Sequence, residues 1–424
     1  MHINKIRLVN FRGMEDLTVE FALGVNVIIG DNGAGKTSLL NGICVALGAL
    51  FNPVYFSDPK LSRQIKDDDV RVTSVLVGDI TENTIQNFPV KIEVDLMMFH
   101  GQEKYDVIKE GSLSSSHMIK DSLKNKMREV LGNPNRPLPL LNFQSAERRL
   151  DLKTNNSEVL KTKQPERKDG YKEAFAGTVR FSEILEWCVQ MDYTEYKLKH
   201  EVREYKKFKA IVSRFMQAIT GSRTPPHVDY SAAIGQLVFY DGQSGEPLNI
   251  LSAGYQNVLC MVMDIARRAV LLNPTLDNFE KLEGIVIIDE IDLHLHPKWQ
   301  WKILDALRAT FPSVQFIVAT HSPIVLSSAK DSRLIFMTSP NEVEILENAY
   351  GINVNDVLEL RQQSTDMPPE LKDLRKKMLR CLNDDDIQGA EAVLKEAVTK
   401  YGEDSALVKR LQEFFEMNKW MVEA

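Results

Sequence analysis

Apolar residues in this chain gather in short runs that end abruptly in glycine or in polar residues. Three such runs cover residues 25–29, 284–288 and 316–319, and they are rich in valine and isoleucine. Runs of this kind are typical of strands that are covered on both faces of a parallel sheet. A helical spacing predicts an arm from about residue 180 to 219, and it rests on Phe181, Ile184, Leu185, Cys188 and Met191. The pattern therefore predicts an α/β fold with a mainly helical insertion.

The last part of the chain shows helical spacing throughout. Apolar residues three and four apart mark three helices, over residues 371–382, 387–397 and 407–415. Gly402 has the character of a C-cap between the last two. No apolar heptad is sustained beyond a few turns, which argues against a long coiled coil. We expect a small helical tail that packs its own core or docks a partner.

The first apolar run leads directly into a glycine-rich loop. Residues 30–37 read Gly-Asp-Asn-Gly-Ala-Gly-Lys-Thr and precede a helix-like segment. Glycines let successive backbone N–H groups converge on phosphate oxygens, and the start of a helix adds positive potential. Lys36 would reach the β and γ phosphates, and the Thr37 hydroxyl would ligate Mg²⁺. The order of strand, loop and helix predicts an ATP-binding phosphate loop.

Two adjacent carboxylates follow the second apolar run, and a histidine follows the third. Asp289 and Glu290 stand at the carboxyl end of a predicted parallel strand, where ligands sit in open α/β sheets. Asp289 would hold Mg²⁺, and Glu290 would orient and deprotonate the attacking water. His321 would contact the γ-phosphate, and the alternative is an ordinary loop histidine. Together these residues predict ATP hydrolysis.

Composition narrows the class of protein further. The 424 residues, of which 43% are hydrophobic, suffice for two to three domains, and no apolar stretch is long enough to span a membrane. Four widely separated cysteines fit reduced thiols, so we expect a cytoplasmic location. His294 and His296 raise the alternative of a metal site, but their two-residue spacing without a nearby cysteine fits zinc poorly.

Two clusters of basic residues stand out against a formal net charge of −7. The first lies in a polar tract and comprises Lys161, Lys163, Arg167 and Lys168. The second crowds a predicted helix, where interspersed glutamates favour a solvated face over a DNA-binding surface. Its members are Lys197, Lys199, Arg203, Lys206, Lys207 and Lys209. DNA contact remains the alternative interpretation.

A further motif, the signature run Leu-Ser-Ala-Gly-Tyr-Gln at residues 251–256, stands shortly before the strand that ends in Asp289. Characteristic runs also occupy residues 292–297 (Asp-Leu-His-Leu-His-Pro), 320–323 (Thr-His-Ser-Pro) and 10–13 (Asn-Phe-Arg-Gly). With the phosphate loop and the Asp-Glu pair, this set resembles ABC-type ATPases of the SMC and RecF group. The resemblance implies a P-loop ABC-type ATPase head that uses ATP and Mg²⁺. It also implies head-to-head dimers, in which the signature run of one subunit closes over ATP held by the other.

The same resemblance assigns roles to individual residues. Ser252 and Gly254 would contact the γ-phosphate across the dimer, and Ser252 could also cap the helix that follows. Asp292 would line the dimer interface, and Gln144, in a candidate glutamine loop, would sense Mg²⁺ and water. The catalytic set is Glu290, His321 and Gln144, and the metal set is Thr37, Asp289 and Gln144. The nucleotide set is Arg12, Asn32, Gly33, Gly35, Lys36, Thr37, Ser38, Ser252, Gly254, Gln256 and Asp292.

The motifs divide the chain into four predicted segments. Residues 1–150 would form the N-terminal lobe of the head, with the phosphate and glutamine loops. Residues 151–235 would form the mainly helical insertion. Residues 236–350 would form the C-terminal lobe, with the signature, the Asp-Glu strand and His321, and residues 351–424 the helical tail.

A compact head with a short helical insertion and a small tail resembles the PtuA-type ATPases of Septu and retron anti-phage defence systems. This implies a homo-oligomer of head dimers that regulates a separate HNH nuclease of the PtuB type, with DNA or a retron RNA–DNA complex as a further partner and no membrane. We interpret the acidic run Asp384-Asp385-Asp386 as a helix cap rather than a nuclease site. The alternative function is a RecF-like DNA-repair ATPase that clamps DNA by itself. A transporter subunit is disfavoured by the long insertion.

Overall fold

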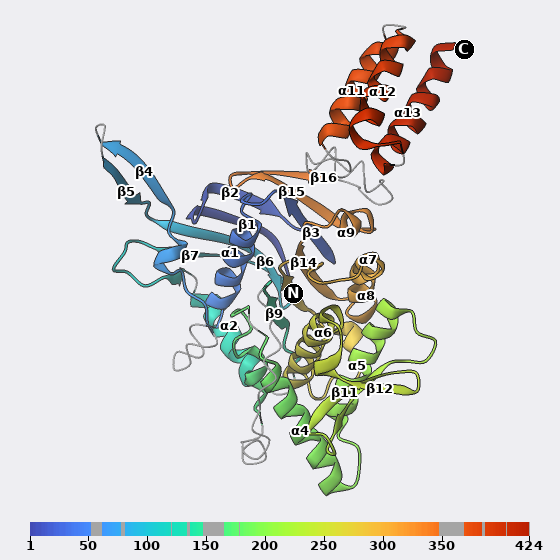
Figure 1. The fold of residues 1–424 in the computed structure, drawn as a ribbon. Coiled ribbons are helices and arrows are strands. Elements are labelled where there is room, and N and C mark those ends of the chain that lie inside the picture. The colour runs from blue at the N-terminus through green and yellow to red at the C-terminus, as the bar shows by residue number, and fades with distance from the viewer. Residues whose placement is uncertain are drawn as a thin grey trace. The chain divides into compact units, whose positions relative to one another are not determined.

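The computed structural model describes residues 1–51, 62–77, 81–119, 121–133, 136–146, 165–177, 179–346, 369–383, 386–403 and 405–423. The chain divides into two compact units, Met1–Ile352 and Asn353–Ala424. The first unit is built on two main sheets, and the described residues of the second form three helices (Figure 1).

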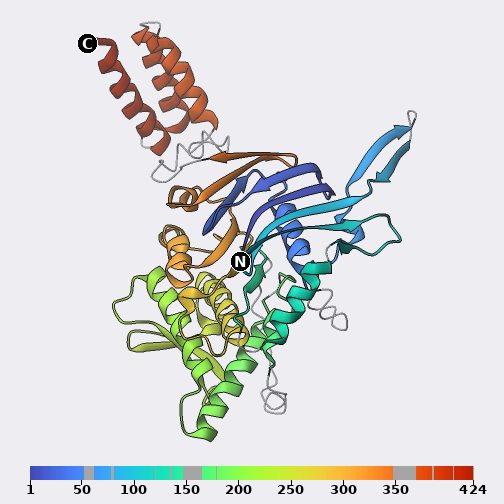
Figure 2. The ribbon, with the colours of Figure 1, turned by 180° about the vertical axis from the view of Figure 1, so that it is seen from behind.

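One main sheet of the first unit is antiparallel and five-stranded. Its order is β2-β1-β6-β7-β8, and the strands are β1 (His2–Phe11), β2 (Met14–Glu20), β6 (Val90–Met98), β7 (Gly101–Lys109) and β8 (His117–Ile119). Residues of β6 alternate between buried and half-buried, as expected for a sheet with one face on the core. A separate hairpin of β4 (Val72–Val77) and β5 (Thr81–Gln86) projects beside this sheet (Figure 2).

The other main sheet carries the apolar runs of the sequence. Its order is β16-β15-β3-β14-β13-β9, and the strands are β3 (Val25–Gly30), β9 (Leu140–Gln144), β13 (Gly284–Ile288), β14 (Val314–Ala319), β15 (Arg333–Ser339) and β16 (Glu342–Leu346). All pairs except β15 with β16 are parallel, and every residue of β3, β13 and β14 is buried. The carboxyl ends of the five parallel strands β15, β3, β14, β13 and β9 therefore meet at one edge.

Helices cover both faces of the parallel sheet. Helix α1 (Lys36–Ala49) lies between the two main sheets, where it contacts β1 and β6 on one side and β3 and β14 on the other. Helix α6 (Ala253–Leu272) packs on β9 and is covered by α4 (Phe181–Leu198) and α5 (Arg203–Thr220). The remaining elements of this unit are α2 (Asp121–Gly132), β10 (His227–Ser231), β11 (Gln236–Asp241), β12 (Ser244–Pro247), α7 (Pro297–Gln300), α8 (Ile303–Thr310), α9 (Pro323–Ser327), and the 3-10 turns η1 (Asp67–Asp69), η2 (Arg167–Tyr171), η3 (Leu248–Ile250) and η4 (Phe279–Lys281).

These elements confirm the predicted α/β class and the three buried strands. The predicted helical arm is a pair of helices, α4 and α5, which are joined at Lys199 in a left-handed conformation (φ 55°). In the described ranges between the phosphate loop and this arm lie six strands, β4 to β9, and most of them were not foreseen. Residues of β6 and most residues of β7 alternate between buried and more exposed, and a short alternating pattern is a weaker signal than the unbroken run of a buried parallel strand.

The second unit confirms the predicted helical tail. It consists of α11 (Pro369–Asn383), α12 (Ile387–Tyr401) and α13 (Ala406–Glu423) around a core of its own. Asp386 caps α12 by accepting a 2.8 Å hydrogen bond from the backbone N–H of Gly389, while Asp384 and Asp385 lie outside the described residues. Gly402 ends the same helix with a positive φ of 82°.

No helix in the described ranges is long and apolar enough to cross a membrane.

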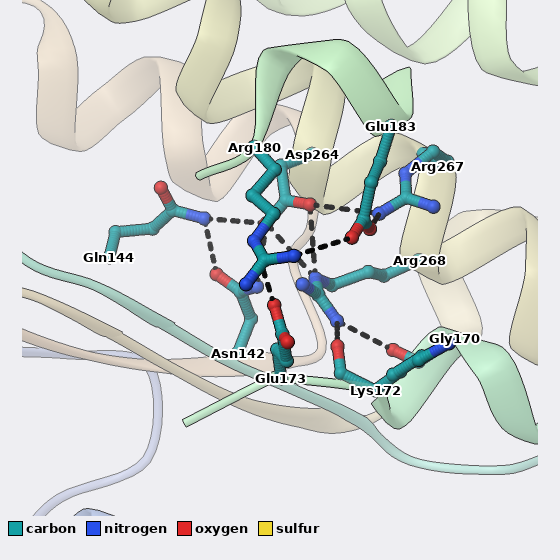
Figure 3. A network of polar contacts seen from close by, with 10 residues as sticks. All are labelled: Asn142, Gln144, Gly170, Lys172, Glu173, Arg180, Glu183, Asp264, Arg267 and Arg268. Carbon is teal, nitrogen blue, oxygen red and sulfur yellow. Dashed lines mark hydrogen bonds and ion pairs between the residues drawn. The ribbon is translucent and has the colours of Figure 1, made fainter. Parts of the chain in front are cut away.

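A buried polar network ties α6 to β9 and to the start of α4 (Figure 3). Asp264 of α6 accepts hydrogen bonds of 2.8 Å from Asn142 and Gln144, and of 3.0 Å from Arg268 Nε. Arg268 also donates to two backbone carbonyls, and Arg267 pairs with Glu183 of α4 at 3.3 Å. Burial by itself would raise the pKa of Asp264, but Arg268 and Arg267 lower it, so the carboxylate is charged at neutral pH. The network therefore fixes three elements at one buried ion pair.

We expect Asp264→Asn to destabilise the protein by about 3–5 kcal/mol, because it leaves the buried guanidinium of Arg268 without its carboxylate. Urea unfolding measures the loss. The matched control is Glu280→Gln, which removes a carboxylate from an exposed 2.8 Å pair with Arg214 and should cost no more than about 1 kcal/mol. Since the pKa of Asp264 is lowered by folding, the difference between wild type and variant should shrink as the pH falls through that pKa. Equal losses in the two variants would show that the network is not a buried ion pair in solution.

Candidate functional site

The phosphate loop joins the buried strand β3 to helix α1. Gly30, the last residue of β3, lies so close to β15 that a Cβ there would be 2.3 Å from the carbonyl oxygen of Met337. Helix α1 begins after Gly35, which has a φ of 95° and contributes no side-chain cap. The first backbone N–H groups of α1 therefore have no capping side chain, which is the arrangement that binds phosphate at helix starts.

Lys36 is buried beneath this loop. Its ammonium donates to the carbonyl oxygens of Gly30 at 2.7 Å and Asp31 at 2.9 Å, and the residue is 6% exposed. Burial lowers the pKa of Lys36, while Glu290, Asp289 and Asp31 raise it. The ammonium is thus held by two carbonyls of the loop, a pair of contacts that a phosphate oxygen could replace.

Thr37 meets Asp289 across 252 residues of sequence. The Thr37 hydroxyl donates to Asp289 Oδ2 at 2.9 Å, and Asp289 is 4% exposed. The backbone N–H of Asp289 also donates to the carbonyl oxygen of Gln144 at 2.8 Å, which aligns the ends of β13 and β9. A hydroxyl and a carboxylate at one point provide the hard oxygen ligands that Mg²⁺ takes.

Glu290 and His321 lie together beside that pair. The distance from His321 Nε2 to Glu290 Oε1 is 3.6 Å, and each side chain is about one-third exposed (32% and 33%). Burial raises the pKa of Glu290, and the neighbouring charges of Asp292 and Asp289 raise it further, although His321 and Lys36 lower it. Glu290 has a positive φ of 49°, an uncommon conformation for a residue with a side chain. The arrangement provides a carboxylate of raised basicity, in reach of solvent, next to the predicted metal ligands.

Asp292 holds the turn after β13 to the turn after β14. The Thr320 hydroxyl donates to Asp292 Oδ1 and itself accepts from the backbone N–H of Ser322 at 2.9 Å. Ser322 then caps α9 through its side chain. His296 has a similar local role, because its Nδ1 accepts from the backbone N–H of Lys298 at the start of α7.

The signature run forms the start of α6 and is tied to the loop after Asp289. A Cβ on Gly254 would lie 2.6 Å from the carbonyl oxygen of His294, so glycine is needed there. Asn257 donates to the carbonyl oxygen of Leu293 at 2.6 Å, and the ring centroids of Tyr255 and Trp299 are 4.4 Å apart. The start of α6 and the loop of residues 291–296 therefore form one packed unit.

The structure bears on the predicted cap of Ser252 and on the surroundings of Gln256, whereas their predicted contacts with nucleotide stay predictions. Ser252 occupies the N-cap position of α6, but its side chain makes no capping hydrogen bond, and it is exposed. The predicted cap is wrong here, and the hydroxyl faces solvent at a helix start. The amide nitrogen of Gln256 donates to three carbonyls of its own protomer, those of Leu248, Asn249 and Leu251. In this arrangement Gln256 shapes the turn before α6 and does not present that amide to a nucleotide.

The side chain of Gln144 also lies elsewhere than predicted. Its amide nitrogen donates to Asn142 Oδ1 at 2.6 Å and to Asp264 at 2.8 Å, and the residue is completely buried (Figure 3). Gln144 pairs with Ile288 in the parallel register, and the Gln144 side chain lies on the α6 face of the sheet. Asp289 follows Ile288 in the chain, and its side chain faces Thr37. The predicted contact of Gln144 with Mg²⁺ stays a prediction, and in this arrangement its amide nitrogen is engaged by Asn142 and Asp264. Its backbone carbonyl, not its amide, adjoins Asp289.

Arg12 is anchored by a partner that the sequence did not indicate. Its Nε donates to Asp69 Oδ1 at 2.8 Å, and its backbone N–H donates to the Asp69 carbonyl at the same distance. The Asp69 side chain is 3% exposed, so it fixes the guanidinium firmly. A contact of Arg12 with nucleotide stays a prediction. So do the roles of Asn32 and Gly33, which are exposed, and of Ser38, which is half-buried.

The basic helix α5 uses most of its cations within the protein. Lys207 donates to the carbonyls of Pro274 at 3.0 Å and Leu276 at 2.6 Å, and Lys209 pairs with Asp229 at 3.2 Å. Arg203 pairs with Asp277, and Lys206 with Glu201. In the first cluster, Lys161 and Lys163 lie outside the described residues, and Lys168 pairs with Glu166 at 3.0 Å. These pairs favour the interpretation of α5 as a solvated helix face.

Two functional features escaped sequence reasoning. Asp264, Arg267 and Arg268 stand within an otherwise apolar stretch of α6, and three charges in such a stretch are a signal that could have been noticed. Asn257 gave no signal, because one polar residue at the end of a motif is commonplace. Within the part of the chain that the structure describes, no hydrogen bond or ion pair joins residues 251–256 to the phosphate loop. The signature and the phosphate loop of one chain are separate surfaces.

The chain matches known protein families over most of its length. Residues 5–219 match a family model described as AAA domain, and a second AAA-domain model matches residues 129–327. A probable ATPase of retron Vc95 from Vibrio cholerae is 27% identical over 80% of this chain and 74% of that protein. A probable ATPase of retron Ec83 from Escherichia coli is 25% identical over 88% of this chain and 78% of that protein. A Septu protein PtuA from Bacillus mycoides is 26% identical over 84% of this chain and 44% of that protein.

A solved structure also aligns with this chain. The SMC head domain from Thermotoga maritima aligns over 82% of this chain and 98% of its own, with 12% identity and a TM-score of 0.41.

We expect Glu290→Gln to retain ATP binding and to slow hydrolysis by roughly 10²–10⁴-fold, the usual contribution of a general base. Steady-state phosphate release and binding of a fluorescent ATP analogue measure the two effects. Burial raises the pKa of Glu290, so wild-type hydrolysis should slow as the pH falls through a value above that of an ordinary glutamate. That limb of the pH profile should vanish in Glu290→Gln. Lys36→Ala serves as the contrast, because it should lose nucleotide affinity. Wild-type turnover by Glu290→Gln would exclude this carboxylate as the base.

We expect Gly254→Ala to leave ATP binding at the phosphate loop intact and to reduce hydrolysis on the order of 10²-fold. The added methyl group would meet the His294 carbonyl at 2.6 Å and displace the signature, and small displacements of positioned groups have effects of this size. Gly132→Ala, in a helix with no atom within 4 Å of the added methyl, is the matched control. Unchanged hydrolysis by Gly254→Ala would separate the signature from the reaction.

Proposed function

We propose that this chain, which belongs to the AAA-domain family of ATPases, is the ATP-hydrolysing subunit of a bacterial anti-phage defence complex. The observation that carries the ATPase assignment is the 2.9 Å hydrogen bond between Thr37 and Asp289. It joins the phosphate loop to the acidic strand with Glu290 and His321 alongside. The names of the retron and Septu relatives support the assignment to defence.

Each residue of the site has a part in the proposed reaction. The loop N–H groups and Lys36 bind the phosphates, and Lys36 exchanges its carbonyl partners for phosphate oxygens. Thr37 and Asp289 would hold Mg²⁺, which neutralises phosphate charge. Glu290 accepts a proton from water as the water oxygen bonds to the γ-phosphorus. The bond between that phosphorus and the bridging oxygen breaks, and ADP and phosphate result. His321 would donate a hydrogen bond to the γ-phosphate.

Two heads would share each ATP. The signature of one chain makes no described contact with its own phosphate loop, and its helix start carries the exposed Ser252 hydroxyl. A helix start of this kind favours an anion, so the signature of one protomer fits the γ-phosphate held by the other. ATP then stabilises the dimer, and its hydrolysis releases it. Asp292 and the loop around it move with the signature, because Asn257 ties them together.

We further propose that the complex acts on nucleic acid through a separate HNH nuclease of the PtuB type. The tail's acidic run is used at Asp386 as a helix cap, and the three tail helices pack into a unit with its own core that is suited to carry a partner. The alternative, a RecF-like ATPase that clamps DNA by itself, has less support, because the cations of α5 are largely paired within the chain. A homo-oligomer built on head dimers, with the nuclease bound, is the expected assembly.

Co-purification of this protein with the products of its neighbouring genes tests this proposal. The Glu290→Gln protein with ATP should elute as a stable oligomer by light scattering, and mass spectrometry should identify an HNH-type protein in the same peak. Lys36→Ala should fail to form the ATP-dependent dimer and is the matched control. A bare ATP-dependent dimer that binds DNA would overturn the nuclease-regulator proposal and favour the repair ATPase.

A further inference from the structure

A cavity opens at the edge of the parallel sheet opposite to the nucleotide residues. It has a volume of about 410 Å³ and lies where β9 and β13 begin, whereas Asp289 and Glu290 follow the end of β13. Four apolar side chains, each at most 2% exposed, form its floor: Met98, Val130, Leu138 and Leu282. A volume of this size with mainly apolar walls is typical of small-molecule sites.

Two cationic side chains, Arg136 and Lys281, line the rim of this cavity and are exposed. His100 is an exposed neighbour in the same lining. The carboxylate of this lining, Glu283, is already paired with the amino group of Met1. Arg136 has only a loose contact of 3.6 Å with Glu129, and both side chains are at least half exposed. The whole chain has a net charge of −7, whereas the rim of the cavity carries positive charge. A positively charged rim suits an anionic ligand.

The turn between β6 and β7 at this cavity is held in an unusual conformation. Its two residues, Phe99 and His100, have φ values of 52° and 63°, and Met98 pairs with Gly101 across the turn. Tight hairpin turns with two positive φ angles strongly prefer asparagine and glycine, so an aromatic pair is strained. Strained backbone concentrates at ligand-binding sites, where the surroundings enforce it. The same two residues also line a neighbouring cavity of about 280 Å³.

We propose that this cavity is a second ligand site, for a small amphipathic anion. The apolar body of the ligand packs on the floor between Met98 and Leu282, and its carboxylate, sulfonate or phosphate group meets Arg136 and Lys281 at the rim. His100 lies on the strained turn beside that group. The site shares no residue with the nucleotide site, so the inference stands independently of the proposed function.

Titration with anilinonaphthalene sulfonate, an aromatic sulfonate that fluoresces in apolar surroundings, tests the proposal. The 424-residue chain, tagged after Ala424, should bind the probe at one saturable site. Arg136→Ala with Lys281→Ala should weaken binding on the order of tenfold or more, because a hydrogen bond to a charged group contributes about 1.5–3 kcal/mol and 1.4 kcal/mol is tenfold. The uncharged parent, phenylnaphthylamine, should bind wild type and this double variant equally.

Two controls keep the test decisive. Lys5→Ala with Arg7→Ala removes two exposed cations of β1 that do not line the cavity, and it should leave sulfonate binding unchanged. Val130→Phe fills the floor and should abolish binding of both probes while ATP still binds, which shows that the variant is folded. Hydrogen exchange should show protection at residues 98–101 when the sulfonate is bound. Any one of three results would overturn the proposal. The two double variants could weaken sulfonate binding equally, Val130→Phe could still bind the probes, or the wild-type protein could fail to bind them.

Discussion

The order of the parallel strands β3, β14, β13 and β9 is the constraint on which the rest of this structure depends. These strands come from distant parts of the chain, and their carboxyl ends meet at one edge. The hydrogen bond from Thr37 to Asp289 spans this edge and links α1 to β13. Because β3 and β13 are wholly buried, their register is fixed by packing, so the positions of Lys36 and Glu290 follow from the core.

A second constraint acts on the opposite face of the sheet. Asp264 and Arg268 are buried charges whose desolvation is unfavourable, and such pairs are weak evidence for stability. Their geometric effect is clearer. Asp264 fixes β9 through Asn142 and Gln144, and it reaches α4 through Arg267, which pairs with Glu183. The same helix, α6, carries the signature at its start. The helical insertion is thereby attached to the same helix that would close over a partner's nucleotide.

The residues of the candidate site form two separately packed groups within the first unit and do not line one common cleft. Glu290, His321 and Thr37 stand with the phosphate loop, while Gly254 and Asn257 bind the start of α6 to the loop after Asp289. The loop of residues 291–296 belongs to both, because Asp292 also accepts from Thr320 next to His321. A displacement of the signature would therefore reach Glu290, the carboxylate proposed as the base, through a few residues of chain.

The sequence by itself determined the nucleotide chemistry, the three buried strands and the helical tail. Those features depend on local order: a glycine loop between strand and helix, unbroken apolar runs that fit a sheet covered on both faces, and carboxylates directly after such a run. The place of Asp289 at the end of a buried strand could be predicted because ligands sit at strand ends, and the structure brings it beside Thr37. Tertiary structure alone decided that Gln144 faces α6 instead of Thr37, since a side chain's face depends on strand register and alternates from residue to residue. Tertiary structure also decided that Arg12 contacts Asp69 and that Gln256 turns back on its own loop. The reason is that the spacing of two segments in the sequence does not specify how far apart they lie in space.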